Sequence, residues 1–246
     1  MIEIRPIEGI PEVDKEAPLG VMIATAAEPQ DGDIVVISQK IVSKAEGRVR
    51  DLADVEPSER AEELAAELGK DPRLVELILS ESREVLRAEH GVLIVETNSG
   101  LVCANAGIDS SNVPGEGKVA LLPEDSDESA RRIRAEIARS GDTRPAVVIV
   151  DSFGRPWRLG QTEVAIGCAG LRAIDDWRGS TDREGQRLGA TMIAIADEVA
   201  SAADLARDKA SGTPVVLVRG LERHVTREDG PGAASLRRDA QHDLFR

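Results

Sequence analysis

Short runs of consecutive apolar residues recur along the chain and predict strands buried inside a sheet. They cover residues 34–38, 145–150 and 215–218. Runs of about four to eight apolar residues between turn signals are typical of strands covered on both faces. Residues 2–7 instead alternate apolar and polar positions, which predicts a strand with one buried face.

Apolar positions spaced three and four residues apart predict helices in other parts of the chain. A helix over residues 58–68 ends at Gly69, and Asp71-Pro72 begins a second one with a cap and a proline in its first turn. The apolar face of this second helix comprises Leu74, Leu77, Ile78 and Val85. A charged helix is predicted over 125–139, and Asp182 is expected to cap a long helix that runs to about residue 206.

The order of these elements predicts an α+β or irregular mixed α/β fold. Residues 92–95 and 101–103 flank Asn98-Ser99-Gly100 and predict a hairpin. Strands and helices do not alternate regularly, which argues against a barrel or a Rossmann sheet. No GxxxxGK[ST] motif is present and no GxGxxG follows a strand, so we expect a non-Rossmann, non-P-loop fold of short buried strands with flanking helices. Residues 221–246 form a polar C-terminal tail, which we expect to be mobile.

Composition excludes several classes of function. Lys and Arg total 31 against 45 Asp and Glu, a net charge of −14, so the overall field opposes nucleic-acid binding. No apolar run approaches the roughly 18–20 residues of a membrane span. Cys103 and Cys168 are isolated, which gives no disulfide framework, and the three histidines have no zinc-site spacing. We therefore expect a cytoplasmic protein that acts on small molecules, without nucleic acid or membrane as a partner.

Acidic and hydroxyl residues at predicted strand ends are the first candidate chemistry. Asp109 follows the hairpin, and Asp151-Ser152 follows the strongest buried run. Carboxylate and hydroxyl oxygens are ligands for Mg²⁺ or Mn²⁺, and two such segments brought together would hold a cation against nucleotide phosphates. For each aspartate taken singly, a loop or helix cap is the simpler interpretation, and the spacing does not decide between the two.

Three further segments carry charge in patterns that permit binding. Residues 38–48 contain Lys40, Lys44 and Arg48, which suit either an anion site or a charged helix face. Residues 151–170 are rich in glycine and arginine, as in a functional loop or a packed Ω-loop. Before the predicted long helix, Arg178 could receive an anion.

Taken together, several segments resemble the GTP-dependent coenzyme F420-0:L-glutamate ligase family over about residues 2–220, and we expect residues 1–220 to form one domain. The segments that carry the resemblance occur in one order: SQKIVSKAEGR at 38–48, AGIDSSN at 106–112, DSFGRPWRLGQTEVAIGCAG at 151–170, DWRG at 176–179, IADEVASAADL at 195–205 and GTPVVLVRG at 212–220. The resemblance implies a reaction in which GTP phosphorylates the terminal carboxylate of coenzyme F420-0, and L-glutamate then attacks the acyl phosphate. It also implies further γ-linked glutamate, Mg²⁺ or Mn²⁺, a monovalent cation such as K⁺, and a homodimer.

The resemblance also implies roles for individual residues. Its metal ligands fall on Asp109, Asp151 and Ser152, and its catalytic residues on Asp109, Asp151 and Lys44. Its nucleotide contacts fall on Ile10, Pro11, Glu12, Val13, Ser38, Gln39, Lys44 and Asn112. The loop at 207–212 departs from the family pattern, and Asp208 is the candidate metal ligand there. Two other readings stay open: a catalytically inactive nucleotide- or metal-binding regulatory module, and a metal-dependent phosphohydrolase.

Overall fold

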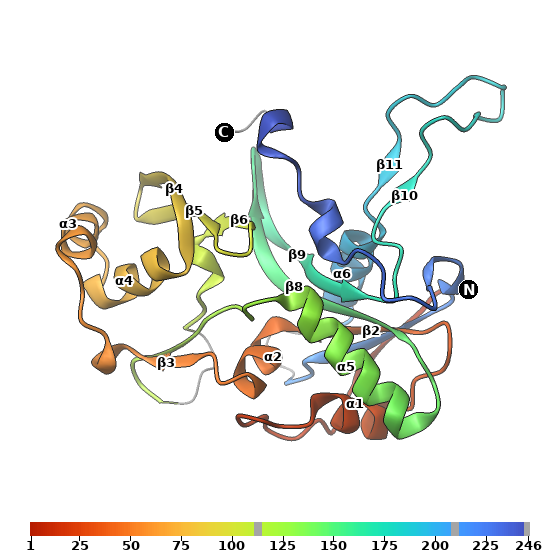
Figure 1. Cartoon of the computed structure of the whole chain (residues 1–246), viewed down its shortest axis with the longest axis horizontal. Helices are drawn as coiled ribbons and strands as arrows, with labels where there is room; N and C mark the ends of the chain where they lie inside the picture. The colour runs from red at the N-terminus through yellow and green to blue at the C-terminus, as the bar shows by residue number, and fades with distance from the viewer. Residues whose placement is uncertain (111–114, 208–211, 244–246) are drawn as a thin grey trace.

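The computed structural model describes residues 1–110, 115–207 and 212–243. A larger body contains the main sheet, and a smaller lobe stands to one side of it (Figure 1). Helices and strands are mixed without a barrel, so the predicted α+β class is confirmed. Among the described residues, no helix has the length and apolar character needed to span a bilayer.

A five-stranded mixed sheet forms the centre of the body, in the order β1-β12-β2-β8-β9. Only β2 and β8 run parallel to each other, and the other neighbours are antiparallel. The strands are β1 (Glu3–Ile7), β2 (Ile34–Ser38), β8 (Ala146–Arg155), β9 (Arg158–Ala169) and β12 (Val215–Arg219). The four strands predicted from apolar runs and alternation are therefore present, and all belong to this sheet.

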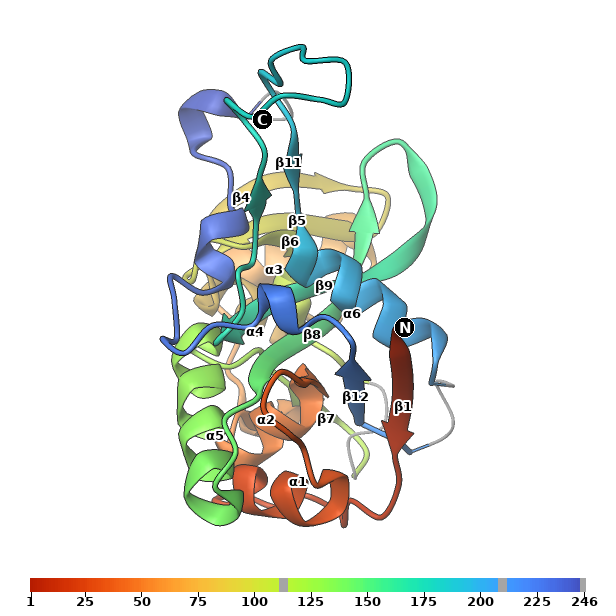
Figure 2. The same cartoon turned by 90° about the vertical axis from the view of Figure 1, so that its right-hand side faces the viewer.

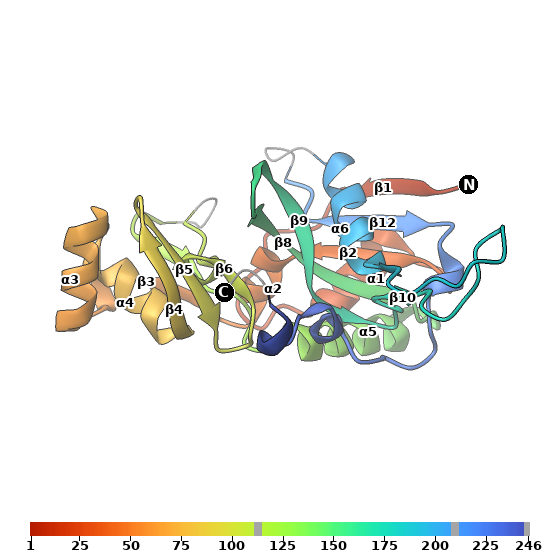
Figure 3. The same ribbon diagram turned by 90° about the horizontal axis from the view of Figure 1, so that it is seen from above.

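Helices cover both faces of the sheet (Figure 3). Alternate strand residues point to opposite faces, so Val35 and Ile37 pack with α1 (Leu19–Ala27) and α5 (Ser126–Gly141) on one side. Ile34 and Val36 pack with α6 (Ile195–Leu205) on the other. This double coverage explains why the central strands are continuously apolar. Helix α5 begins after the cap Asp125 and confirms the predicted charged helix.

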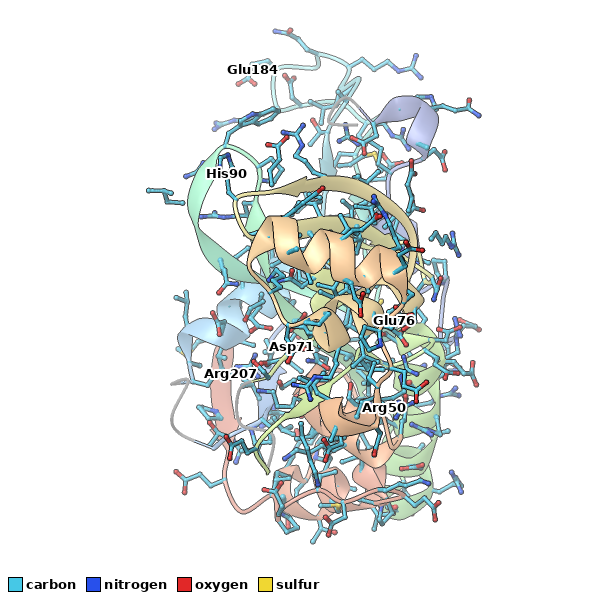
Figure 4. The ribbon with its side chains drawn as sticks, turned by 90° about the vertical axis from the view of Figure 1, so that its left-hand side faces the viewer. Arg50, Asp71, Glu76, His90, Glu184 and Arg207 are labelled. Carbon is cyan, nitrogen blue, oxygen red and sulfur yellow. The ribbon has the colours of Figure 1, made fainter. Side chains whose placement is uncertain are left out.

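The smaller lobe has its own apolar core. It contains α3 (Glu59–Leu68), α4 (Pro72–Ser80), β4 (Ser82–Glu89), β5 (Val92–Thr97) and β6 (Val102–Ala104). The predicted cap Asp71, labelled in Figure 4, accepts the amide of Arg73, and Ser58, the first residue of the predicted helix over 58–68, accepts that of Ala61. The placement of Val85 on α4 is wrong, because the helix ends at Ser80 and Val85 pairs with Val95 in the predicted hairpin sheet.

Short elements complete the chain. They are α2 (Gln39–Ala45), the paired strands β3 (Val49–Asp51) and β7 (Lys118–Ala120), the paired strands β10 (Asp175–Asp176) and β11 (Met192–Ile193), and 3-10 turns at Leu52–Asp54, Asn105–Gly107, Glu222–His224, Ala233–Leu236 and Ala240–His242. Strands β10 and β11 begin an arm that projects from the body (Figure 1). The predicted helix start at Asp182 is wrong: its carboxylate accepts the amides of Glu184 and Gln186 within the arm, and α6 begins at Ile195.

The segment after β12 packs onto the body, so the expected mobility of the C-terminal tail is wrong for residues 221–237. Val225 forms a bridge to Leu171, and Ala233 is buried against the sheet. The buried carboxylate of Asp127 accepts the amides of Ala233 and Ala234 at 2.7 and 3.1 Å. Because the segment is polar in composition, its sequence does not reveal the few buried contacts that hold it in place.

Candidate functional site

The candidate site lies at the carboxyl ends of the parallel strands β2 and β8. Ser38, the last residue of β2, is opposite Val150, so Asp151 and Ser152 follow at the same edge of the sheet. Helix α2 begins directly after β2. Ligands bind beyond the carboxyl ends of parallel strands, because the connections that leave these strands converge there.

Asp151 and Ser152 lie inside β8, which is longer than predicted. The sequence predicts a strand that ends at residue 150 and an irregular glycine-rich stretch after it, and this prediction is wrong. Strand β8 continues to Arg155 and forms a long antiparallel hairpin with β9, whose tip extends away from the sheet (Figure 2). The ladder places Asp151 opposite Val164 and Ser152 opposite Glu163. Both candidate ligands therefore project from a rigid strand pair.

Asp109 reaches this region from the end of the lobe. The three residues Asn105, Ala106 and Gly107 have φ values of 52°, 54° and 68°. Left-handed backbone costs a non-glycine residue on the order of 1–2 kcal/mol. Two hydrogen bonds then join the backbones of Asp109 and Ala120, with N–O distances of 3.0 and 2.8 Å. A strained turn followed by a backbone bridge thus fixes the direction of the chain at Asp109.

One pocket of about 290 Å³ brings the three candidate metal ligands together. It lies where β6 of the lobe meets the β8–β9 hairpin (Figure 3). Its lining comprises Cys103, Ala104, Asn105, Gly107, Ile108, Asp109, Asp151, Ser152, Phe153, Gly154 and Gln161. Asp109 and Asp151 are 42 positions apart in the sequence (151 − 109), yet they face the same cavity.

Negative charge dominates this pocket. The carboxyl of Asp151 lies among protein atoms, and this burial raises its pKa to about 7, with further raising contributions from Glu163 and Asp109. The amide of Ser152 and the charge of Lys40 act in the opposite direction. Lys40 Nζ lies 2.8 Å from Asp109 Oδ2. One lysine offsets part of the charge, and the surplus favours a bound cation.

Helix α2 connects this pocket to the N-terminal loop. Lys40 and Lys44 are one helical turn apart on α2, and Lys44 forms an ion pair with Glu12. The loop also packs by its apolar residues, because Val13 is buried and Ile10 lies partly buried beside it in the body's core. Glu12 and Lys44, which the family resemblance assigns to nucleotide binding, are therefore neighbours.

The remaining residues that the resemblance assigns to nucleotide or metal binding differ in their burial and contacts. Pro11 is exposed beside Glu12, and Ser38 is partly buried at the end of β2. Gln39 is buried, and its side-chain oxygen accepts the hydroxyl of Ser43 at 2.8 Å. Asn112 and Asp208 lie outside the described residues.

Arg48 does not belong to this pocket, although the sequence groups it with Lys40 and Lys44. Its guanidinium contacts Glu81 at 2.6 Å and Glu124 at 3.2 Å, in a separate cavity of about 300 Å³ beside the lobe. Two carboxylates thus already neutralise the charge of Arg48, and the cationic cluster at 38–48 divides between two sites.

The donor set of the pocket fits a hard divalent cation. Within residues 1–110, 115–207 and 212–243, no three His, Cys, Asp or Glu side chains form a metal cluster by themselves. Asp109, Asp151 and Ser152 nevertheless all line this pocket, and carboxylate and hydroxyl oxygens suit Mg²⁺ or Mn²⁺. Burial and the charge of Asp151 raise the pKa of the Cys103 thiol to about 12, so this neighbouring cysteine remains protonated and is unsuited to act as a nucleophile.

Comparison with known proteins identifies the family of this chain. The model of the F420-0:gamma-glutamyl ligase family matches residues 9–220. A protein of Methanopyrus kandleri named coenzyme F420:L-glutamate ligase is 42% identical over 245 residues, which cover 98% of this chain and 97% of that protein. Proteins of the same name from Haloarcula marismortui and Halorubrum lacusprofundi are 42% and 45% identical, over 100% and 90% of this chain and 96% and 88% of theirs.

These matches define the chain as a member of a ligase family. The chain belongs to the F420-0:gamma-glutamyl ligase family, as the order of its resembling segments along the sequence predicts.

Two residues of the site were not singled out from the sequence. Lys40 was noted only as part of a charged segment, although its spacing from Lys44 places both on one helix face. Glu163 gave no signal, because it becomes a neighbour of Ser152 only through the pairing of β8 with β9. Predicting the hairpin from its alternating outer residues would have been the way to find it.

Proposed function

We propose that this protein is a GTP-dependent ligase that joins L-glutamate to coenzyme F420-0 and then adds further γ-linked glutamate. The observation that carries the proposal is the convergence of Asp109, Asp151 and Ser152 in one pocket, with Lys40 at its edge. Membership of the ligase family supports the reaction class.

The chemistry begins with a carboxylate, which is a poor electrophile at neutral pH. Transfer of the γ-phosphoryl group from GTP gives an acyl phosphate and GDP. The α-amine of L-glutamate then attacks the acyl carbon, the C–O bond to phosphate breaks, and an amide, inorganic phosphate and a proton result. Such a reaction depends mainly on positioning and on neutralisation of phosphate charge.

The residues of the pocket suit these requirements. Asp109, Asp151 and Ser152 would hold Mg²⁺ or Mn²⁺, which supplies positive charge to the phosphate oxygens when bound. Lys40 and Lys44 of α2, which pair with Asp109 and Glu12, would contact the phosphate groups, and the loop at Ile10–Val13 would hold the nucleotide. A monovalent cation such as K⁺ would assist.

The tip of the β8–β9 hairpin supports the choice of acceptor. Trp157 and Leu159 are 84% and 98% exposed; Trp157 lies between Arg155 and Arg158, and Leu159 follows Arg158. An exposed indole offers a stacking surface for a planar heteroaromatic ring, and arginine binds phosphate. We expect Trp157→Ala to raise KM for the deazaflavin substrate about tenfold, as stacking surfaces contribute roughly 1–3 kcal/mol per ring. An unchanged KM would remove the hairpin tip from the binding surface.

The homodimer is part of the same proposal. The arm between β10 and β11 projects from the body and exposes Trp177 and Met192 (Figure 2). Large exposed apolar side chains on a projecting element favour a protein contact, and we assign the dimer contact to this arm. Light scattering of the whole chain and of the Trp177→Ala protein measures their masses in solution. A monomeric parent protein would contradict the proposed dimer.

One experiment separates the ligase from the two alternative readings. The protein is incubated with GTP, Mn²⁺, L-glutamate and coenzyme F420-0, and the products are weighed by mass spectrometry. A product heavier by one or more glutamyl units, formed with GDP, supports the ligase. GDP without conjugate indicates a phosphohydrolase, and no turnover with retained GTP binding indicates a regulatory module.

A further inference from the structure

Lys40 and Asp109 form a close ion pair at the candidate metal site. Lys40 Nζ lies 2.8 Å from Asp109 Oδ2, and the two side chains are 17% and 32% exposed. Both residues take part in further interactions, so this pair is one of several contacts that place them. The ammonium group of Lys40 therefore contacts a carboxylate that the family resemblance assigns to a divalent cation.

The ion pair sets Lys40 in competition with a cation for the same carboxylate. Carboxylate oxygens ligate Mg²⁺ directly, at about 2.0–2.1 Å. A divalent cation on either oxygen of Asp109 would thus stand close to the ammonium group of Lys40, and two positive charges at such a separation repel strongly in a partly buried site. Cation binding therefore requires Lys40 to leave Asp109 or to stay against this repulsion.

Asp151 lies on the same side of the main sheet as α2. It follows Ile149 by two positions in β8, and alternate residues of a strand share one face. Ile149 belongs to the part of the core that includes Ile41 and Val42 of α2. Lys40, the residue before Ile41, thus approaches the pocket from the side to which Asp151 projects.

The charge of Lys40 acts on both carboxylates of the pocket. Burial is the main influence on Asp151 and raises its pKa, whereas Lys40 is among the groups that lower it. Lys40 already supplies part of the positive charge that a cation held by Asp109 and Asp151 would supply.

Helix α2 also places Lys40 beside the proposed phosphate position. Lys40 and Lys44 are one turn apart, so their side chains project from the same face of the helix. Lys44 pairs with Glu12, in the loop that the family resemblance assigns to the nucleotide. A phosphate group that reaches Lys44 is therefore near Lys40 as well. Lysine carries a compact charge on a flexible stem, so it can turn from a carboxylate to a phosphate while the helix stays in place.

We propose that Lys40 exchanges Asp109 for a nucleotide phosphate when a divalent cation binds, and that this exchange couples cation binding to nucleotide binding. The inference rests on the metal and nucleotide sites of the proposed function. Without nucleotide, Lys40 competes for Asp109 and weakens cation binding. With nucleotide, the phosphate attracts the ammonium group and the competition ends. The coupling is reciprocal, so the cation raises nucleotide affinity by the same factor.

The first measurement is a Mn²⁺ titration of the nucleotide-free protein, with free Mn²⁺ measured by electron paramagnetic resonance. Coupling between two sites typically changes affinity by roughly 5- to 150-fold, so we expect Lys40→Met to bind Mn²⁺ about tenfold more tightly than the parent protein. A folding defect would lower the affinity, so it cannot produce this gain. Lys40→Arg keeps the charge and should bind Mn²⁺ no more tightly than the parent.

The second measurement is a calorimetric titration with a GTP analogue that has an imido bridge between its β- and γ-phosphates. It is made once with saturating Mn²⁺ and once with chelator, and the ratio of the two affinities gives the coupling. Lys40→Met should reduce this ratio about tenfold, because its nucleotide-free form no longer opposes the cation.

Lys44→Met is the matched control for the Mn²⁺ titration. It removes the same charge from the same face of α2, but Lys44 pairs with Glu12 instead of Asp109. Its nucleotide-free Mn²⁺ affinity should change little compared with that of Lys40→Met. The control separates the loss of one ion pair from a general loss of positive charge.

Three results would overturn this inference and leave the proposed function standing. An equal or weaker Mn²⁺ affinity of nucleotide-free Lys40→Met would show that Lys40 does not compete for Asp109. An equal gain in Lys44→Met would show that only the overall charge of α2 matters. An unchanged affinity ratio would show that cation and nucleotide are coupled without Lys40.

A fourth result would have a wider consequence. If the parent protein binds no Mn²⁺, with or without the GTP analogue, the metal site itself is absent. The proposed function then loses the observation that carries it, and the role of Lys40 is overturned with it.

Discussion

Asp127 and Asp151 are both embedded in the body, but their surroundings differ. Asp127 accepts three backbone amides, from Cys168, Ala233 and Ala234, at 2.7 to 3.1 Å. Gly232 has a φ of +81° there, and a Cβ on it would come within 2.3 Å of the Asp127 carboxyl carbon. The C-terminal segment is thus fitted closely around one carboxylate. We call Asp127 with these three donors the C-terminal clasp.

Asp151 has a stabilising backbone amide, from Ser152, and a stabilising charge, from Lys40, against two acidic neighbours, Asp109 and Glu163. The protein therefore leaves its negative charge only partly compensated. A buried carboxylate supplied with donors by its own chain stabilises the fold, whereas one with surplus charge is suited to bind something from outside. The contrast between the clasp and the pocket supports our proposal that Asp151 is a functional residue, whereas Asp127 holds the C-terminal segment in place.

Replacement of Asp151 should have the largest effect, and it should fall on activity alone. Asp151→Asn is expected to reduce glutamyl transfer by about 10³-fold or more, a loss of about 4 kcal/mol of transition-state stabilisation. The melting temperature of the metal-free protein should stay equal or rise, because the substitution removes a repelled charge. Product mass and a thermal melt in chelator measure the two quantities. Near-normal conjugation would show that Asp151 is not part of the catalytic site.

Replacement of Asp127 should have the opposite signature. Asp127→Ala leaves three buried amides without an acceptor, which we expect to reduce the free energy of unfolding by about 3 kcal/mol or more. For a chain of this size the melting temperature should fall by about 10 °C. The specific activity of the folded fraction should remain near normal. Glu128→Gln, an exposed neighbour on the same helix, is the control and should change stability by less than about 0.5 kcal/mol. A large loss of kcat in the folded Asp127→Ala protein would contradict the contrast between a structural Asp127 and a functional Asp151.

The sequence predicts the parts of this molecule that depend on local pattern. The buried strands of the main sheet are visible as apolar runs, because both of their faces are covered by helices. The cap Asp71 is visible because the cap and its amide are only two residues apart, and the helices that begin near Ser58 and Asp125 are visible from the spacing of their apolar and charged residues.

Features that depend on distant pairing are not visible in the same way. Val85 continues the apolar spacing of α4, and only the pairing with β5 shows that it belongs to a strand. Asp182 has the residue type of a helix cap but closes a turn in the arm, because no helix follows it directly. The convergence of Asp109 with Asp151 was expected from family resemblance, since spacing left a capping role open for each. The pairing of Glu163 with Ser152 requires the hairpin register.

Lys44 extends the contrast between functional and structural charges to a positively charged residue of the proposed site. It pairs with Glu12, whose side chain is 69% exposed and lies in the proposed nucleotide-binding loop at Ile10–Val13. Removal of the Lys44 side chain should therefore have little effect on folding. Lys44→Ala is expected to weaken GTP binding about tenfold, roughly 1.4 kcal/mol, by loss of one charge-assisted phosphate contact. Calorimetric titration of the parent and Lys44→Ala proteins with GTP measures this change. The Glu12→Gln protein, titrated in the same way, is the control for loss of the ion pair alone. Equal GTP affinity in Lys44→Ala would contradict the phosphate role.

A pH titration of the C-terminal segment should give the smallest effect. Asp229 lies 2.6 Å from the buried guanidinium of Arg134, which also donates to the carbonyls of Pro145 and Thr226. Burial raises the pKa of Asp229, but the hydrogen bond and charge of Arg134 outweigh it and lower the pKa on balance.

A carboxyl whose pKa is lower in the folded than in the unfolded protein stabilises the fold above its unfolded pKa, near 3.8, and this contribution disappears as the pH falls through the folded value. Asp229→Asn should therefore be less stable than the parent by about 1 kcal/mol at pH 7, and at an acidic pH below the folded pKa of Asp229 the two should be equally stable. Urea unfolding at both pH values measures the difference. A gap that persists unchanged at low pH would mean that Asp229 stabilises the segment by packing, and the ionic part of its contact with Arg134 would then be negligible.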